Sequence, residues 1–159
     1  MTLHRLEAVQ TLPVTVEEAW EFFSDPRNLA RITPSSMDFR ITSDVPERVH
    51  EGLIVTYTLR PMIGIPVQWA TEITHVEEGV RFVDEQRVGP YAMWHHEHTF
   101  TAVAGGVEMR DVVHYALPLG PLGDLVHTIA VRSRVRSIFA YRRRALVARF
   151  GQMAVAPRV

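Results

Sequence analysis

Two short alternations hold the residues of this chain that could do chemistry. They are Trp94-x-His96-x-His98-x-Phe100 and, eleven residues after it, Asp111-x-Val113-x-Tyr115. Residues two apart on a strand share one face, so each alternation lines one side of a sheet. Histidine titrates near neutral pH and is the commonest general acid or base in enzymes. Two imidazoles, a carboxylate and a phenol on neighbouring strands therefore have the composition of a functional site.

A tight turn between the two alternations brings them together. Residues 104–107 contain Gly105-Gly106, and glycine tolerates the positive φ that short hairpin loops require. With Gly105-Gly106 as the loop, the predicted pairs are Phe100 with Asp111, His98 with Val113, and His96 with Tyr115.

The pattern along the chain predicts the elements that position this patch. Residues 3–11 alternate as a first strand, and Thr15 and Glu18 form a capping box that begins a short helix. Asp25-Pro26 begins a second short helix. Strands are then predicted at 39–43, 53–60, 67–76, 80–88, 94–103 and 107–117. The short turns between these strands favour an antiparallel meander, because parallel pairing needs long crossovers.

A long C-terminal helix is predicted over residues 122–150. Its apolar stripe consists of Thr128, Val131, Val135, Ile138, Phe139, Arg142 and Leu146. The helix is the only element large enough to cover one face of the sheet, so we expect one α+β domain over residues 1–151. Residues 152–159 are expected to form a flexible tail. The connections at 61–66 and 118–123 are unusually apolar, which suits a cavity mouth, a dimer contact or packing under the helix.

Composition excludes several functions. The chain has 159 residues, a formal net charge of −1 and no cysteine, and every basic side chain other than histidine is arginine. Lysine Schiff-base chemistry and thiolate chemistry are therefore excluded. Near-neutral charge gives no electrostatic case for nucleic acid. No run is long and apolar enough to span a bilayer, and residues 1–5 show no secretory signal, so a cytoplasmic protein is expected.

The chain resembles the START-like helix-grip superfamily, which includes polyketide cyclases and lipid-transfer domains. The matching segments are residues 13–23, Phe82-x-Asp84-x-Gln86 with Gly89-Pro90-Tyr91, the two opening alternations, Leu122-Gly123, and Ile138-Phe139-x-Tyr141-Arg142. They are similar to a bacterial subgroup described as cyclase/dehydrase-like or ligand-binding. This resemblance implies a curved antiparallel sheet of six or seven strands wrapped on the long helix, with two short helices after the first strand.

The favoured hypothesis is a binding protein for a small hydrophobic or amphipathic ligand, lipid-like or polyketide-like, held between sheet and helix. Its candidate ligand-binding residues are Asp84, Gln86, Trp94, His96, His98, Phe100, Asp111, Val113, Tyr115 and Arg142. One alternative is a cyclase or dehydratase, with catalytic candidates His96, His98, Asp111 and Tyr115. Another is a lipid-chaperone or protein-interaction module that acts through the apolar connections. The expected partner is a small hydrophobic molecule, with no cofactor, no nucleic acid and no stable membrane insertion, in a monomer or homodimer.

Two residues of this set raise separate questions. His96, His98 and Asp111 could form the two-histidine, one-carboxylate face that holds a metal. The predicted register puts Asp111 opposite Phe100, away from His96, so no metal is expected. Arg142 lies within an apolar stripe, where an unpaired charge is costly. It is expected either to pair with Asp84 or Asp111 or to contact the ligand, and both place it at the cavity wall.

Overall fold

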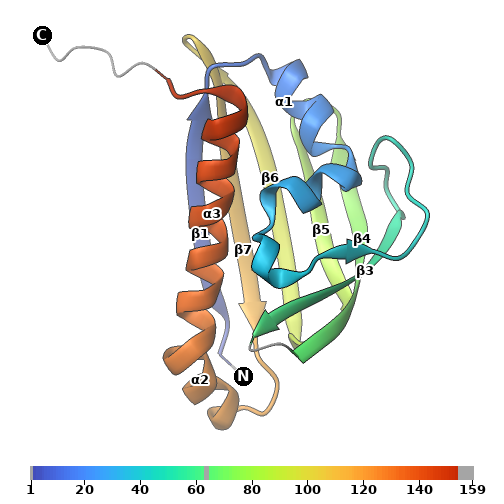
Figure 1. The fold of residues 1–159 in the computed structure, drawn as a ribbon, viewed down its shortest axis with the longest axis vertical. Coiled ribbons are helices and arrows are strands. Elements are labelled where there is room, and N and C mark those ends of the chain that lie inside the picture. The colour runs from blue at the N-terminus through green and yellow to red at the C-terminus, as the bar shows by residue number, and fades with distance from the viewer. Residues whose placement is uncertain (1, 63–64, 154–159) are drawn as a thin grey trace, which may run out of the picture.

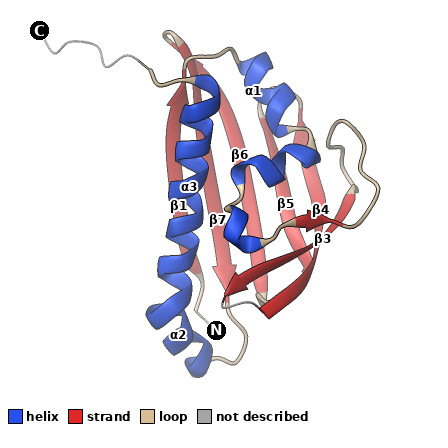
Figure 2. Cartoon of the chain, viewed as in Figure 1, coloured by secondary structure: helices blue, strands red, loops and turns tan. Residues whose placement is uncertain are grey.

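The computed structural model describes residues 2–62 and 65–153 and shows a curved sheet wrapped around helices (Figures 1 and 2). The seven strands are β1 (His4–Leu12), β2 (Arg40–Ile41), β3 (Ile54–Met62), β4 (Ile65–Glu77), β5 (Arg81–Val88), β6 (Met93–Val103) and β7 (Gly106–Ala116). They pair antiparallel in the order β1-β7-β6-β5-β4-β3-β2. The predicted α+β class and meander are confirmed.

Helices cover one face of this sheet in two groups (Figure 1). The C-terminal helix consists of α2 (Pro121–Val126), a π-helical turn η3 (His127–Val131) and α3 (Arg132–Phe150), and it runs along β1 and β7. The shorter elements α1 (Val16–Phe23), η1 (Pro26–Ile32) and η2 (Ser35–Met37) lie over the middle strands. The sheet curves around both groups, which is the helix-grip arrangement. No helix in the described ranges is long and apolar enough to cross a bilayer.

Local signals set the first helices as predicted. The Thr15 hydroxyl accepts from the Glu18 backbone N–H at 3.2 Å, and the Glu18 carboxylate accepts from the Thr15 N–H at 2.8 Å. This capping box is confirmed, and α1 buries Trp20, Phe22 and Phe23 against the sheet. The second short helix begins at Pro26 behind its Asp25 cap, but it is a 3-10 helix.

The hairpin register differs from the prediction by two residues. The loop is Ala104-Gly105, and Gly106 is already a strand residue paired with Val103. Gly105 alone of the loop has positive φ, at 81°. At Gly106 an added Cβ would stand 2.0 Å from the carbonyl oxygen of Leu12, so close approach to β1 requires glycine there. The predicted pairs are wrong: the structure pairs His98 with Asp111, His96 with Val113, and Trp94 with Tyr115.

The long helix contains one departure that changes which residues face the sheet. Its π turn at His127–Val131 adds a residue to the turn, as such insertions do. His127 is therefore buried and Thr128 is exposed, contrary to the predicted stripe. Beyond the insertion the stripe holds, with Val135, Arg142 and Leu146 buried.

Two predicted segments, the loop at 61–66 and the tail at 152–159, lie partly outside the residues that the structure describes. Residues 61–66 were expected as a loop, but β3 extends to Met62 and β4 begins at Ile65. Residues 63–64 lie outside the described residues. The expected tail at 152–159 lies largely outside them too, since description ends at residue 153.

Candidate functional site

Two histidines and two aspartates from three adjacent strands form one buried cluster. In the register, His96 of β6 lies opposite Asp84 of β5, and His98 lies opposite Asp111 of β7. The Asp84 Oδ2 atom lies 2.8 Å from His98 Nε2 and 3.3 Å from His96 Nδ1. The Asp111 Oδ1 atom lies 2.9 Å from His98 Nδ1 and 3.1 Å from His96 Nε2. All four ring nitrogens thus face a carboxylate oxygen, and each imidazole bridges the two acids.

Arg142 closes the cluster from the helix side. Its Nη2 lies 3.6 Å from Asp111 Oδ1, which is the internal arginine–aspartate pair that the sequence suggested. The guanidinium also lies over the rings of Phe23 and Phe139, at 5.5 and 5.8 Å from their centroids. Its buried Nε has no hydrogen-bond partner in the described part of the chain. Arg142 Nη2 also lies 3.4 Å from His98 Nδ1, so the guanidinium brings one positive charge to the cluster and keeps one unused donor at Nε.

The environment separates the two imidazoles in proton affinity. Burial would lower the pKa of His98, but its hydrogen bonds to Asp111 and Asp84 outweigh burial and raise that pKa. Burial lowers the pKa of His96, and the positive charge of His98 lowers it further. The environment therefore raises the proton affinity of His98 above that of His96. A proton on His98, together with the charge of Arg142, would balance the two carboxylates of the cluster.

The carboxylates are correspondingly held in their charged form. Burial would raise the pKa of Asp111, but the charge of Arg142 and the hydrogen bonds from both histidines hold it well below its usual value. For Asp84 burial opposes ionisation too, and the histidines and Arg142 lower its pKa nonetheless. A neutral His96 carries one ring proton. Its Nε2 lies 3.1 Å from Asp111 and its Nδ1 lies 3.3 Å from Asp84, so one nitrogen donates the proton to its carboxylate and the other presents a lone pair beside its own.

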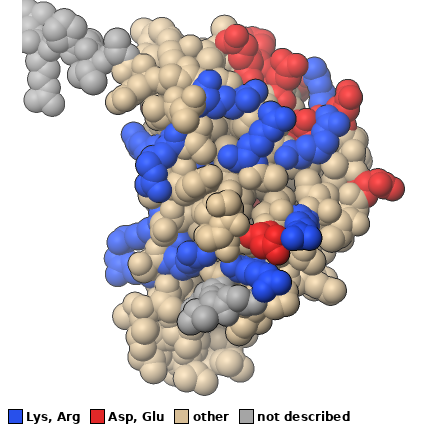
Figure 3. All heavy atoms as spheres, viewed as in Figure 1, with Lys and Arg blue, Asp and Glu red and all other residues tan. Residues whose placement is uncertain are grey.

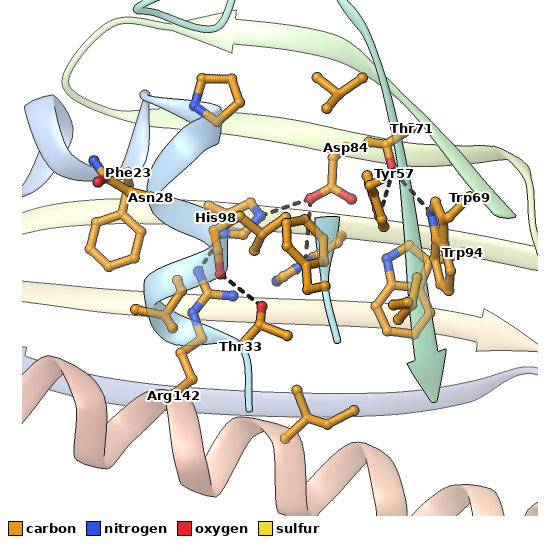
Figure 4. Close-up of a pocket in the computed structure, with 18 of the residues that line it drawn as sticks. Phe23, Asn28, Thr33, Tyr57, Trp69, Thr71, Asp84, Trp94, His98 and Arg142 are labelled. Atoms are coloured by element: carbon orange, nitrogen blue, oxygen red, sulfur yellow. Dashed lines mark hydrogen bonds and ion pairs between the residues drawn. The ribbon is translucent and has the colours of Figure 1, made fainter. Parts of the chain in front are cut away.

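This polar cluster forms one wall of a partly open cavity of about 210 Å³ between the sheet and the helices. Figure 4 shows Asp84, His98 and Arg142 gathered on one side of it and Trp69 and Trp94 on the other. The remaining lining is mostly apolar and comes from every layer of the fold: Phe22, Phe23, Leu29, Ile32, Met37, Phe39, Val49, Val55, Leu59, Ile73, Phe82, Val135, Ile138 and Phe139. A mostly apolar wall with a few convergent polar groups is the usual make-up of a small-molecule site.

The structure divides the ten predicted binding residues into two groups. Five line the cavity: Asp84, Trp94, His96, His98 and Arg142. The other five lie elsewhere: Asp111 behind the histidines, Phe100 in the core against Trp20, Val113 under the helix, Gln86 bound to the backbone of Tyr91, and Tyr115 bound to His127. Tyr115 Oη lies 2.9 Å from His127 Nε2, so this phenol contacts the start of the C-terminal helix and is not part of the histidine–aspartate cluster.

A second polar group in the cavity was not singled out from the sequence. Thr71 of β4 accepts a hydrogen bond from Trp69 Nε1 at 3.0 Å and lies 3.1 Å from the Tyr57 hydroxyl. Burial raises the pKa of Tyr57 above its usual range, so the phenol stays protonated. The alternation Trp69-x-Thr71 in the sequence carried the same signal as Trp94-x-His96 and could have found this group.

The cluster has part of the geometry of a metal centre. Donor atoms of Asp84, His96 and His98 lie within 4.8 Å of one another, so these three could hold an ion. Asp111 lies 3.1 Å from His96, so the reason given for expecting no metal is wrong. The separations are nevertheless those of hydrogen bonds, and a protonated His98 cannot act as a ligand. The absence of a metal stays a prediction.

The cluster predicts a stability maximum near pH 6.5, where histidine ordinarily titrates. His98 has a raised pKa, so its stabilisation is complete below 6.5 and is lost as pH rises through the folded value. His96 has a lowered pKa, so its effect is reversed and stability falls as pH drops below 6.5. Urea unfolding measured from mildly acidic to mildly alkaline pH should show both slopes. His98→Gln should remove the fall in stability on the alkaline side, whereas His50→Gln, at an exposed position, should retain it. If the two variants show the same dependence of stability on pH, His98 is not the group responsible for the alkaline loss.

The fold and site together define a helix-grip protein with a mostly apolar cavity and a buried ionic cluster at one wall. The family model described as polyketide cyclase / dehydrase and lipid transport matches residues 4–151. The chain belongs to this family, within the START-like superfamily. No curated protein matches it.

Solved structures share the fold at low identity. Protein CV1439 from Chromobacterium violaceum superposes with a TM-score of 0.70 at 13% identity, covering 94% of this chain and 98% of that one. Protein Ms6760 from Mycobacterium smegmatis gives 0.65 at 20% identity, covering 94% and 98%. Protein TTHA0849 from Thermus thermophilus gives 0.68 at 15% identity, covering 92% and 99%. Likeness at this level of identity concerns the fold alone.

Proposed function

We propose that this protein binds a small, mostly apolar molecule carrying a hydroxyl group in the cavity between the sheet and the helices. The observation that carries the proposal is the cavity itself, whose apolar wall meets the Asp84, His96, His98 and Arg142 cluster on one side. Family membership supports it, because the family model describes cyclases and lipid transport.

Size limits the ligand. The cavity of about 210 Å³ is smaller than common ligand sites of roughly 300–1,000 Å³. A dry cavity of ~150 Å³ accepts benzene, so this one suits a molecule of one or two rings. Trp69 and Trp94 supply flat aromatic walls for such rings (Figure 4).

Polarity selects a hydrogen-bond donor on the ligand. The Asp84 carboxylate is an acceptor at the cavity wall, and with the ring proton of His96 on Nε2, the Nδ1 atom is a second acceptor 3.3 Å away. A ligand hydroxyl can donate to either of them and accept from Arg142. A ligand carboxylate would instead add a negative charge to a cluster whose charges already balance.

The same geometry favours anchoring over acid–base turnover. Each ring nitrogen lies within 3.3 Å of a carboxylate, so the imidazoles are held in place by two partners each. A general base needs a free lone pair aimed at the substrate. No ring nitrogen of the pair meets that requirement, since the lone pair of a neutral His96 also lies beside a carboxylate.

Paired probes test this function. 2-Naphthol should quench the fluorescence of Trp69 and Trp94 saturably, and naphthalene should bind about fivefold to tenfold more weakly because it lacks the hydroxyl. Ile138→Phe, which fills the cavity from α3, should weaken 2-naphthol binding at least roughly tenfold by removing space.

Ile54→Phe is the matched control, since Ile54 is 45% exposed and does not line the cavity. It should bind 2-naphthol like the parent chain. Equal loss in both variants, or no saturable quenching with either probe, would overturn the proposed function.

A further inference from the structure

One end of the molecule carries a concentrated apolar surface. Five large apolar side chains of α2, η3 and the preceding loop face solvent: Leu119 (73% exposed), Leu122 (57%), Leu125 (56%), Val126 (43%) and Ile129 (72%). We call these five residues the apolar tip. The only charged residue between positions 118 and 131 is Asp124, which accepts a hydrogen bond from Thr2 at 2.8 Å. Scattered exposed apolar residues are ordinary, but five within eleven positions mark an interaction surface.

Basic side chains form a band directly above this tip. Figure 3 shows the lower end of the molecule, at α2, as uncharged surface with arginines gathered over the first part of α3. Arg132 and Arg136 lie three and seven residues beyond Ile129, so along the helix axis they stand about 5 and 10 Å above it. Neither has a carboxylate within 4.0 Å in the described residues.

A polar groove between β1 and α3 receives these arginines. It has a volume of about 610 Å³, and its lining includes Arg132, Arg136, His4, His127 and Glu7, whose carboxylate pairs with Arg5 and Arg110. The buried His4 Nε2 lies 3.8 Å from Asp124 Oδ1 and makes no hydrogen bond in the described part of the chain. Two like charges one helical turn apart repel each other unless an anion lies between them. The groove is therefore suited to an anionic group.

We propose that the apolar tip docks this protein on an anionic lipid surface, with Arg132 and Arg136 at the level of the headgroups. Interfacial helices bury their apolar face about 5–10 Å into the boundary of headgroups and acyl chains. That depth immerses the tip and brings both arginines to the phosphates. This docking is peripheral, and it is independent of which molecule occupies the cavity.

Charge argues for a lipid surface over a second copy of the chain. A symmetric dimer through the tip would bring the Arg132 and Arg136 pairs of both copies toward one shared interface. Asp124 is the only acid within the tip, and Thr2 already binds it. An anionic lipid surface supplies the negative charge that the tip lacks.

Vesicle sedimentation with the full chain tests the proposal. The chain should bind vesicles of phosphatidylcholine mixed with phosphatidylglycerol more tightly than pure phosphatidylcholine, and added salt should weaken the binding. Leu122→Asp with Ile129→Asp should reduce binding at least roughly tenfold by removing apolar area. Arg132→Gln with Arg136→Gln should reduce it by at least about fivefold, and only on anionic vesicles.

Val80→Asp is the matched control, because Val80 is 44% exposed and lies in the β4–β5 turn at the other end of the sheet. It should leave binding unchanged, and thermal unfolding should show all variants folded. Three results would overturn the proposal: no binding to anionic vesicles at low salt, an equal loss with Val80→Asp, or a dimer that the tip variant separates into monomers.

Discussion

Replacement of Asp111 by asparagine is expected to lower the free energy of unfolding by about 3–5 kcal/mol. Asp111 lies within 3.6 Å of both histidines and Arg142, and it is buried. The amide keeps the shape of the side chain but removes the negative charge. A protonated His98 and the Arg142 guanidinium then remain buried with only Asp84 to balance them. Urea unfolding at neutral pH measures the loss.

Asp38→Asn provides the control for charge removal. Asp38 pairs with Arg40 at 2.9 Å and with Arg60 at 3.5 Å on the surface, where such pairs contribute about 0–1 kcal/mol. A double-mutant cycle with Arg142→Met sharpens the test, because Asp111→Asn should cost less once that cation is gone. A loss no larger than that of Asp38→Asn, or strict additivity in the cycle, would show that the cluster is not electrostatically coupled.

Gly106→Ala is expected to lower the free energy of unfolding by about 3 kcal/mol, because the new Cβ would clash with backbone atoms that cannot move without disturbing the sheet. The site has no room, since that atom would stand 2.0 Å from the Leu12 carbonyl oxygen. The first pairs of β7 with both β1 and β6 must then shift. Because these pairs set which residue faces His98, NMR cross-peaks between residues 98 and 111 should weaken along with stability.

Gly52→Ala separates overpacking from backbone strain. Gly52 has a positive φ of 80° and open space around its Cα, so alanine there meets only the left-handed penalty of about 1–2 kcal/mol. Gly106 is an ordinary strand residue, and its cost comes from contact alone. If both variants lose the same stability and the cross-peaks persist, then close packing at Leu12 does not set the register.

The periodic pattern of apolar residues along the chain predicted the class of fold well. Periods of two and of about 3.6 residues are local properties, and the strands and the long helix follow from them. The Thr15 cap and the burial of Val135, Arg142 and Leu146 could likewise be predicted, because each depends on neighbours a few residues away.

The site was predictable in part. His96, His98 and Arg142 could be chosen because polar groups within an apolar pattern need partners. The partners of the two histidines could not be assigned correctly, since a shift of two residues in one hairpin moves Asp111 from Phe100 to His98. The contact between Tyr57 and Thr71 was harder to predict, because the register of β3 and β4 shifts between Leu59 and Met62, nearer the turn.

By itself, therefore, the sequence determined an antiparallel meander covered on one face by a long helix, with two histidines two residues apart on one strand. The curvature of the sheet around that helix was implied by the family resemblance. Tertiary structure alone decided that Asp84 and Asp111 flank these histidines and that Tyr115 turns to His127 instead. The physical reason is one of range. The pattern of apolar residues reports on near neighbours in the sequence. The register of the β6–β7 hairpin involves the close contact of Gly106 with Leu12, and the face that the C-terminal helix turns to the sheet depends on the π turn at His127–Val131.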